Sequence, residues 1–287
     1  MKRIHLAVSL AFGLVSGAFA QVTVPSEKAI SQVNGVLWTQ QSLEHHAGAA
    51  MAYQAAADAL PRLIRSKAWA SLEHGPAKSR RPAVILDVDE TVLDNSAYDA
   101  WAVQNNQSFE PKSWAAWIAL EAAGAVPGAA SFTQQAAKLG VDVFYVTNRE
   151  CTPDETDPCP ALTHTQANLA RLGFARANDR EAFMFKKQRP EWSASDKTSR
   201  REKIAQTHRI IMLVGDDMGD FLPVANVERL RRGEADEQAG AMLAHFGKNL
   251  FMIPNPSYGS WEKALPASPA ARIPLLKGPE AWVKPQG

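Results

Sequence analysis

The sequence has little of several features that would place a protein in a specialised class. Charge of one sign is not in excess, because 31 lysine and arginine residues face 30 aspartate and glutamate residues. Glycine (17 residues) and proline (18 residues) show no periodic enrichment. The balanced charge argues against a nucleic-acid polymer or an anionic membrane surface as the main partner, and the missing periodicity excludes a fibrous chain.

Length and composition instead indicate an ordinary globular protein. The chain of 287 residues is 46% hydrophobic and 21% charged. That length is enough for one large domain, or for a domain with an attached subdomain, around an extensive buried core.

The N-terminus has the pattern of an export signal. Positive charges at positions 2 and 3 precede an uncharged stretch up to residue 17, and Ala18-Phe19-Ala20 places small residues at both cleavage positions. The alternative, a retained anchor, is disfavoured because the stretch is shorter than the ~20 residues of a spanning helix. No cysteine follows for lipid attachment. We therefore expect a signal peptide over residues 1–20, cleavage after Ala20, and a periplasmic or secreted protein without a stable membrane anchor.

Cysteine is scarce, and its placement is informative. The only two, Cys151 and Cys159, lie close together in a proline-rich loop. An exported protein meets an oxidising compartment, which favours a disulfide between them. Closing so short a loop contributes roughly 2–3 kcal/mol in the chain-entropy model. A metal site on these cysteines is disfavoured, because no second pair of cysteine or histidine residues stands at a supporting spacing.

The pattern of apolar residues divides the chain into two regions. Residues 21–80 carry apolar side chains at helical spacing, which predicts an N-terminal helical segment belonging to a cap or subdomain. Residues 81–287 show short apolar runs separated by amphipathic stretches, which is typical of βαβ units. The runs are Ala83–Leu86, Val141–Val146, Ala182–Phe185, Ile210–Val214 and Leu250–Ile253.

These runs are continuously apolar, as in the strands of a parallel sheet that is covered by helices on both faces. Residues 81–287 are therefore predicted to form an α/β core of this kind. An insertion at about residues 95–128, rich in tyrosine and tryptophan, separates the first two runs. We expect it to form a mainly helical cap over the site.

Polar side chains follow three of the runs directly. Asp87 and Asp89 follow the first, Thr147 follows the second, and Asp216 and Asp220 follow the fourth. In an open α/β sheet, ligands bind at the carboxyl ends of the strands, so these residues are expected to converge. A single aspartate at a strand end is more simply explained as a helix N-cap, but four aspartates at two strand ends, with a threonine at a third, do not fit that explanation.

The spacing of these acids suggests their chemistry. Asp87 and Asp89 are two residues apart, so in extended backbone both side chains leave on the same side. Two adjacent carboxylates in a confined site cannot both be cheaply ionised, so one stays protonated as an acid unless a cation compensates. The further carboxylates of Asp216 and Asp220 imply such a cation, and oxygen-only ligation favours Mg²⁺.

Together these motifs resemble the haloacid-dehalogenase (HAD) superfamily of phosphohydrolases, and more closely its class C acid phosphatases, the lipoprotein-e-like exported 5′-nucleotidases. The resemblance spans the chain after the signal segment. It rests on four segments: Val84–Asn95 with DVDETVLDN, Phe144–Arg149 (FYVTNR), Gly215–Phe221 (GDDMGDF) and Pro254–Glu262 (PNPSYGSWE). It implies a HAD-like Rossmann-type sheet with a helical cap, and a phosphomonoesterase that acts on small phosphate esters, among them nucleotides.

The resemblance also implies roles for the acids. Asp87 is expected to attack the phosphoryl group and form an aspartyl-phosphate, and Asp89 to protonate the leaving alkoxide and then activate water. Asp216 is expected to ligate Mg²⁺ directly with Asp220 in support, and the ion also takes Asp87 and the main-chain carbonyl of Asp89. Thr147 is expected to hold a phosphoryl oxygen.

A lysine that pairs with Asp87 and the phosphate is expected upstream of the fourth run. We choose Lys197, because it stands at a helix start predicted after Pro190, and keep Lys186 as the alternative. For substrate binding, the resemblance points to Asn148 and to aromatic side chains that stack on a nucleobase. The aromatic candidates are Phe109, Trp114, Tyr258 and Trp261, although packing in a core or subdomain is the simpler explanation of each tryptophan.

Two departures from the family pattern are visible. Gln21 stands where lipoprotein members carry an acylated cysteine, and Asp217 stands where the family often shows asparagine. Two other functions stay open at this stage: an exported protein that binds a nucleotide, cofactor or haem, and a phosphotransferase that uses an alcohol as acceptor. The sequence also leaves the oligomeric state open, a homodimer included.

Overall fold

The structure is a computed structural model that describes residues 26–66, 70 and 81–277. Its centre is a five-stranded parallel sheet with the strand order β5-β4-β1-β6-β7. The strands are β1 (Arg81–Leu86), β4 (Asp142–Glu150), β5 (Phe183–Lys186), β6 (His208–Gly215) and β7 (Leu250–Met252). A short antiparallel pair, β2 (Leu93–Asp94) and β3 (Gly124–Ala125), lies outside it. All five predicted apolar runs are strands of the parallel sheet, so the predicted α/β core is confirmed.

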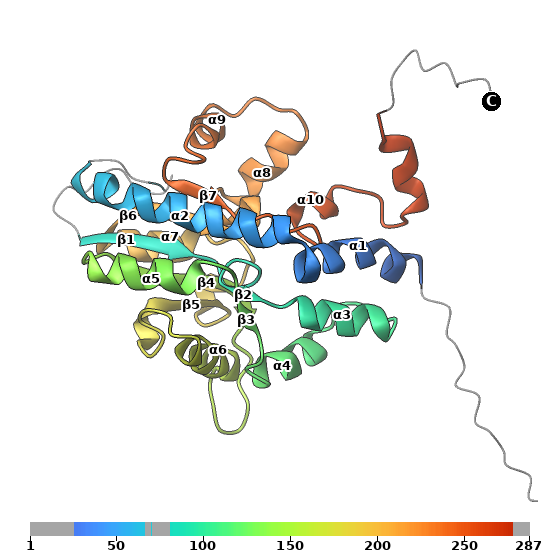
Figure 1. Ribbon diagram of the computed structural model, residues 1–287, viewed down its shortest axis with the longest axis horizontal. Helices are drawn as coiled ribbons and strands as arrows, with labels where there is room; N and C mark the ends of the chain where they lie inside the picture. Colours follow the sequence, from blue (N-terminus) through green and yellow to red (C-terminus); the bar gives the residue numbers. More distant parts are fainter. Residues whose placement is uncertain (1–25, 67–69, 71–80, 278–287) are drawn as a thin grey trace, which may run out of the picture.

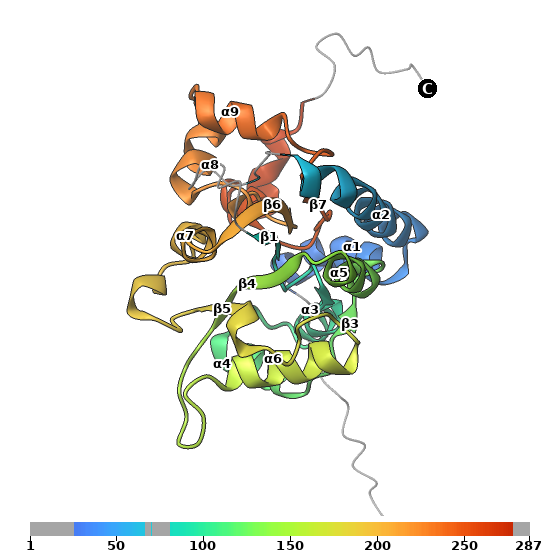
Figure 2. The same ribbon diagram turned by 90° about the vertical axis from the view of Figure 1, so that its left-hand side faces the viewer.

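Helices cover both faces of the sheet (Figures 1 and 2). They are α1 (Glu27–Gln41), α2 (Leu43–Arg65), α3 (Ser96–Gln104), α4 (Pro111–Ala119), α5 (Ala129–Lys138), α6 (Pro160–Arg171), α7 (Thr198–Ala205), α8 (Val224–Arg231), α9 (Glu237–Leu243) and α10 (Ser260–Lys263). Short 3₁₀ turns are η1 (Arg180–Ala182), η2 (Pro190–Trp192), η3 (Met218–Asp220) and η4 (Ala270–Leu275).

Alternation along the strands explains why both faces are covered. In β1, Val84 and Leu86 join one buried cluster with side chains of α2, α5 and α6. Ala83 and Ile85 join a second cluster with side chains of α7, α8 and α9. Figure 2 shows these two groups of helices on opposite sides of the sheet. Because both faces of the sheet are buried, the side chains that point to either face within these runs are apolar. Apolar and polar residues therefore do not alternate along the runs.

The N-terminal region is helical, as predicted, through α1 and α2. α2 lies against the sheet, where Tyr53 is buried and its hydroxyl donates to the carbonyl of Thr91 at 2.6 Å. Arg209 of β6 donates to the carbonyls of Leu63 and Ile64 at the C-terminal end of α2, where a cation is favoured. α1 turns away at Ser42 and packs against α3. The division into a core and a cap that includes residues 21–80 stays a prediction.

The insertion contains α3, α4 and β3, and is mainly helical as predicted (Figure 1). α3 packs against α1, and α4 packs against α6, so the insertion lies beside the carboxyl ends of the strands. The predicted signal peptide, with its cleavage site after Ala20, lies outside the described residues. Within the described part of the chain, no helix is both long enough and apolar enough to cross a membrane.

Cys151 and Cys159 are joined by the predicted disulfide, with their Cα atoms 4.5 Å apart. Cys151 directly follows β4, and its backbone N–H donates to the carbonyl of Lys186 at 2.8 Å. Cys159 is the residue before α6. Both side chains are buried. The disulfide therefore fixes the start of α6 to the end of β4.

Replacing both cysteines, as Cys151→Ala with Cys159→Ala, is expected to lower the free energy of unfolding by about 2–3 kcal/mol and to leave the fold intact. The reason is that the unfolded chain regains the freedom of a short loop. Urea unfolding of the variant, compared with wild type in the presence and absence of a reductant, measures this. Equal stability of reduced and oxidised wild-type protein would contradict the expectation.

Candidate active site

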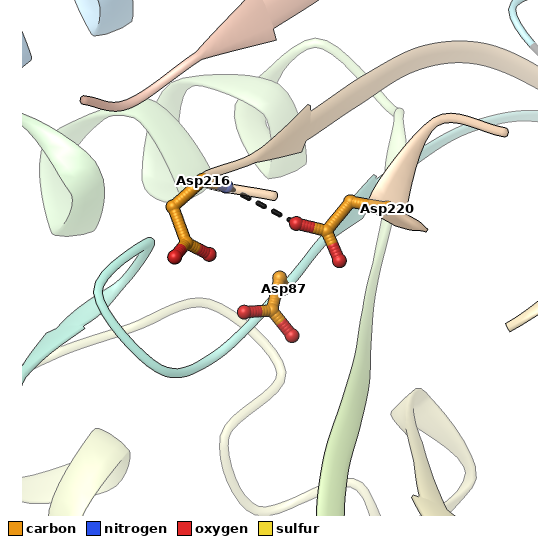
Figure 3. A group of neighbouring side chains, drawn as sticks. All are labelled: Asp87, Asp216 and Asp220. Carbon is orange, nitrogen blue, oxygen red and sulfur yellow. Dashed lines mark hydrogen bonds between the residues drawn. The ribbon is translucent and has the colours of Figure 1, made fainter. Parts of the chain in front are cut away.

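Three carboxylates meet at the carboxyl ends of β1 and β6 (Figure 3). One oxygen each from Asp87, Asp216 and Asp220 lies within 4.8 Å of the others. Asp87 and Asp220 are buried, and Asp216 is half-buried. The sequence predicted this convergence. It arises because β1 and β6 are parallel neighbours, so that the loops after them begin at the same edge of the sheet.

The loop after β6 folds back on itself through Asp220. Its Oδ2 accepts the backbone N–H groups of Asp216 and Asp217, at 3.1 and 3.0 Å. Gly215 is required at the start of this loop, because a Cβ there would collide with the Asp220 carboxylate. The carboxylate of Asp220 thus shapes the loop that presents Asp216, and its supporting role in metal binding stays a prediction.

Lys197 lies between two of the acids. Its Nζ donates to Oδ1 of Asp87 and, at 2.6 Å, to Oδ1 of Asp220. Burial alone would lower the pKa of Lys197, but the two carboxylates raise it above its ordinary value, so the lysine is charged. α7 begins at the next residue, as the sequence predicted. Lys186, the alternative, instead pairs with Glu150 at 2.9 Å, away from the three acids.

One buried lysine does not balance three carboxylates. Burial, together with the charges of Asp220 and Asp89, raises the pKa of Asp87 to about 7, against the lowering effect of Lys197. Burial, followed by the charges of Asp220 and Asp87, also raises the pKa of Asp216 well above its ordinary value. An excess of buried negative charge with oxygen donors only is the environment that a hard divalent cation stabilises. Asp87, Asp216 and Asp220 therefore fit a divalent metal ion.

Asp89 lies apart from this group and is held by an arginine. Oδ1 of Asp89 accepts from Nε of Arg149 at 2.9 Å and from Nδ2 of Asn95 at 3.0 Å, and it forms an ion pair with Nη2 of Arg149 at 2.8 Å. Arg149 is buried and also donates to the hydroxyl of Thr165 in α6 at 2.8 Å. The side chain of Asp89 is thereby kept out of the group formed by Asp87, Asp216 and Asp220, and metal ligation by its main-chain carbonyl stays a prediction.

Thr147 is fully buried at the carboxyl end of β4, and its hydroxyl lies 3.4 Å from Oδ2 of Asp89. Asn148 is exposed, and its Oδ1 accepts from Nη2 of Arg200 at 2.7 Å. Thr147 is therefore brought together with the acids. The side-chain oxygen of Asn148 binds Arg200, so its side-chain NH₂ is the group that can donate to a substrate.

Two neighbouring arginines in α7, which the sequence analysis did not single out, hold Lys197 in place. Arg200 donates to the carbonyl of Thr147 at 2.5 Å, and Arg201 donates to the carbonyl of Asp220 at 3.0 Å. Both guanidinium groups are buried, although such residues are usually exposed. They connect the lysine segment to the ends of β4 and β6. Their only sequence signal is a pair of adjacent positive charges three and four positions after Lys197.

The aromatic candidates of the insertion lie on the side of Asp89. The Trp114 ring centroid is 5.5 Å from Cζ of Arg149, which is a cation–π contact. Phe109 lies 6.0 Å from Trp114, between ring centroids, and is 63% exposed. Trp117, which was not predicted as a site residue, donates to Oδ1 of Asn95 at 2.9 Å. Trp114 and Trp117 of the insertion are thus connected to Asp89 through Arg149 and Asn95.

Tyr258 and Trp261 lie on the opposite side, in and after the loop that follows β7. Asn255 of this loop donates to Oδ2 of Asp216 at 2.9 Å, while Thr91 donates to Oδ1 of Asp216 at 3.1 Å. Trp261 is 47% exposed, and its indole N–H donates to the carbonyl of Tyr258 at 3.2 Å. Asn255 belongs to the quoted PNPSYGSWE segment, but nothing in its local sequence identified it as the partner of Asp216.

A second group of buried acids lies next to the site. Glu90 has a left-handed backbone, with φ 55°, and its Oε1 accepts from the N–H of Asn95 at 2.9 Å. Its Oε2 and the Oδ2 of Asp99 are buried, with no hydrogen-bond partner among the described residues. Burial raises the pKa of Glu90 well above its ordinary value and that of Asp99 to about 7, with neighbouring acids adding to both shifts. The sequence analysis did not find this pair.

Paired aspartates, a buried hydroxyl and a lysine at the strand ends of a parallel sheet define a phosphohydrolase of the HAD type. The family model for HAD superfamily, subfamily IIIB (acid phosphatase), matches residues 11–261. The chain therefore belongs to this family, and it is a phosphoric monoester hydrolase. Members of the superfamily use a divalent metal, in agreement with the group of three acids.

Solved structures agree with this assignment. The chain is similar to the class C acid phosphatase from Bacillus anthracis, with 28% identity and a TM-score of 0.70 over 89% of this chain and 100% of that one. The structure of the same Bacillus anthracis enzyme with tungstate bound matches with the same values. The predicted HAD-like fold and the predicted family are both confirmed.

The structure predicts different outcomes for the two lysines. Lys197→Ala leaves two buried carboxylates without their cation, so it is expected to lower the free energy of unfolding by about 3–5 kcal/mol and to abolish phosphatase activity. Lys186→Ala removes only a partly exposed ion pair and is expected to change either quantity little. Activity and urea unfolding of both variants measure this. Wild-type activity in Lys197→Ala would contradict the assignment.

Asp99 predicts a dependence of stability on pH. An unfolded chain releases this proton near pH 3.8, whereas the folded protein keeps it up to about pH 7. The contribution of Asp99 to the free energy of unfolding therefore falls as the pH rises from about 4 to about 7. Asp99→Asn is expected to flatten the profile and to be stabilised relative to wild type above pH 7. Thermal unfolding from pH 4 to pH 8 measures this, with exposed Asp58→Asn as the control. Identical profiles for both variants would contradict it.

Proposed function

We propose that this protein is an exported, Mg²⁺-dependent acid phosphatase that acts on nucleoside 5′-monophosphates through an aspartyl-phosphate intermediate. The observation that carries the proposal is the position of Asp87. Its carboxylate is buried at the centre of the site, with Lys197 on one side and Asp216 and Asp220 within 4.8 Å.

In the first step, an oxygen of Asp87 attacks phosphorus, and the bond between phosphorus and the ester oxygen breaks. Asp89 donates a proton to the departing alkoxide, so the alcohol leaves neutral and Asp87 carries the phosphoryl group. In the second step, Asp89 removes a proton from water, which attacks phosphorus and releases Asp87 and inorganic phosphate. Asp89 is suited to this exchange because Arg149 and Asn95 bind its Oδ1, while its Oδ2 faces the hydroxyl of Thr147 at 3.4 Å, the group proposed to bind the phosphoryl oxygen.

Other groups bind and orient the phosphoryl group. The ammonium of Lys197 neutralises negative charge beside Asp87, and the hydroxyl of Thr147 is in place to donate to a phosphoryl oxygen. Asp87, Asp216 and the main-chain carbonyl of Asp89, with Asp220 in support, would hold Mg²⁺, which when bound would further neutralise the charge of the phosphoryl oxygens. Tungstate is a tetrahedral oxyanion like phosphate, so its binding to the Bacillus anthracis enzyme supports an oxyanion site in this chain.

Nucleotide selectivity is proposed to come from aromatic side chains on either side of the acids. Trp114, with Phe109 beside it, lies next to Arg149 on one side, and Tyr258 and Trp261 lie beyond Asn255 on the other. A base stacked on an aromatic face gains roughly 1–3 kcal/mol with little dependence on its identity. Export is supported by the signal-like N-terminus and by the disulfide.

The mechanism is tested with phosphate release by wild type, Asp87→Asn and the control Asp179→Asn, each with Mg²⁺ or EDTA. We expect EDTA to abolish activity and Asp87→Asn to lower kcat by at least about a thousandfold, because amide nitrogen and oxygen are poor nucleophiles. Asp179 caps the 3₁₀ turn η1 away from the acids, so Asp179→Asn should retain activity. Full activity in EDTA would contradict the metal, and an active Asp87→Asn would contradict the nucleophile.

Substrate preference needs its own measurement. Among 5′-AMP, 3′-AMP and glycerol phosphate, we expect the highest kcat/KM for 5′-AMP, because only the 5′ ester extends the base away from the acids toward the aromatic residues. Equal values for all three esters would leave the phosphatase in place and contradict the nucleotidase.

A further inference from the structure

The segment that follows β7, residues 253–261, is here called the C-terminal loop, and residues 215–220 the acidic loop. Two side chains connect these loops. Asn255 donates to Oδ2 of Asp216, and its own Oδ1 accepts the backbone N–H groups of Ser257 and Tyr258, at 2.9 and 3.4 Å. The backbone at Ser257 and Tyr258 is thereby connected, through Asn255, to a proposed metal-binding acid.

Asp217 makes the second connection and uses both of its oxygens. Oδ1 accepts the N–H of Gly219 within the acidic loop at 2.8 Å, and Oδ2 accepts the N–H of Ser260 at the start of α10. The sequence analysis treated this residue only as an extra acid beside Asp216. In the structure, its carboxylate is the link between the metal-binding acids and the segment that carries Tyr258 and Trp261.

The surrounding backbone is shaped for this contact. Gly259 has a φ of 147°, a conformation that side chains other than glycine rarely adopt, and a Cβ there would lie 3.2 Å from Oδ2 of Asp217. On the other side, Gly35 of α1 packs against the backbone of Pro256 and Ser257. Figure 1 shows α1 and α10 next to each other at this end of the molecule. The C-terminal loop is thus held between α1 and the acidic loop.

We propose that Asp217 is a specificity-determining positioning residue: its bond to Ser260 holds the C-terminal loop at the distance from the acids that lets Tyr258 and Trp261 contact the base of a nucleotide whose phosphate lies at Asp87. The inference rests on the proposed nucleotidase function. It assigns to Asp217 an effect on substrates that carry a base and none on the phosphoryl chemistry itself.

Two variants remove the same bond from opposite ends. Asp217→Ala removes both acceptor oxygens, so the N–H of Ser260 loses its partner on the acidic loop. Ser260→Pro removes the N–H and leaves the acidic loop untouched, and proline is tolerated at the first position of a helix. Asp179→Ala is the matched control, because Asp179 also caps a 3₁₀ turn and also binds with both oxygens.

The measurement is kcat/KM for 5′-AMP and for glycerol phosphate, together with binding of adenosine to the metal-free protein by calorimetry. We expect the ratio of the two kcat/KM values to fall about tenfold in Asp217→Ala and in Ser260→Pro, mainly through the KM for 5′-AMP, and adenosine binding to weaken in parallel. Asp179→Ala is expected to keep the wild-type ratio. Thermal unfolding shows whether each variant is folded.

Three outcomes overturn the proposal. A wild-type ratio in both folded variants shows that the bond does not position the loop. An equal loss for both substrates, with adenosine binding unchanged, shows that Asp217 serves the acidic loop alone. A wild-type enzyme that hydrolyses glycerol phosphate but does not prefer 5′-AMP removes the nucleotide part of the proposed function, and this inference with it. Only that last outcome would also contradict the proposed nucleotidase function.

Discussion

The buried charge at the carboxyl ends of β1 and β6 is the constraint on which the rest of the site depends. Carboxylates taken out of water are costly unless a cation and hydrogen-bond donors face them. Lys197 supplies one positive charge to Asp87 and Asp220, and Arg200 and Arg201 fix the lysine segment to the neighbouring strand ends. The remaining negative charge is what makes the position of Asp216 suitable for a divalent ion. Stability and activity are therefore opposed here, because the same unbalanced acids that weaken the metal-free fold create the metal site.

The sheet explains how residues so distant in the chain share one site. β4 extends past the end of β1, since it pairs with β1 only up to Tyr145 and then runs on to Glu150. This extension carries Thr147 and Arg149 to the height of Asp89. The disulfide between Cys151 and Cys159 fixes the far end of β4. α6 begins directly after Cys159, and its Thr165 accepts a hydrogen bond from Arg149. A covalent bond outside the site thus stabilises the segment that orients Asp89, the proposed catalytic acid.

What the sequence could predict follows from how local each signal is. Apolar runs and the acids directly after them are contiguous, so the five strands, Asp87, Asp216 and Asp220 were all predictable. Partners were not, because Arg149 meets Asp89 across 60 positions and Asn255 meets Asp216 across 39, and no local pattern records such a pairing. The helical spacing of α2 likewise showed that it has an apolar face. It did not show that this face packs on the sheet, with Tyr53 reaching Thr91 beside the first acids.

The two catalytic functions of the site connect to two different segments of the chain. Asp89, the proposed acid, is joined through Arg149 and Asn95 to the insertion with Trp114 and Trp117. Asp216, the proposed metal ligand, is joined through Asn255 to the loop with Tyr258. Each segment proposed to bind the organic part of a substrate is therefore connected, through polar side chains, to a group proposed to act on its phosphate. A substrate that engages both segments would orient the acid and the metal-binding acid together, whereas a small ester would reach neither. Selection among phosphate esters in this fold is then a matter of how well the acids are oriented, in addition to how tightly the ester is bound.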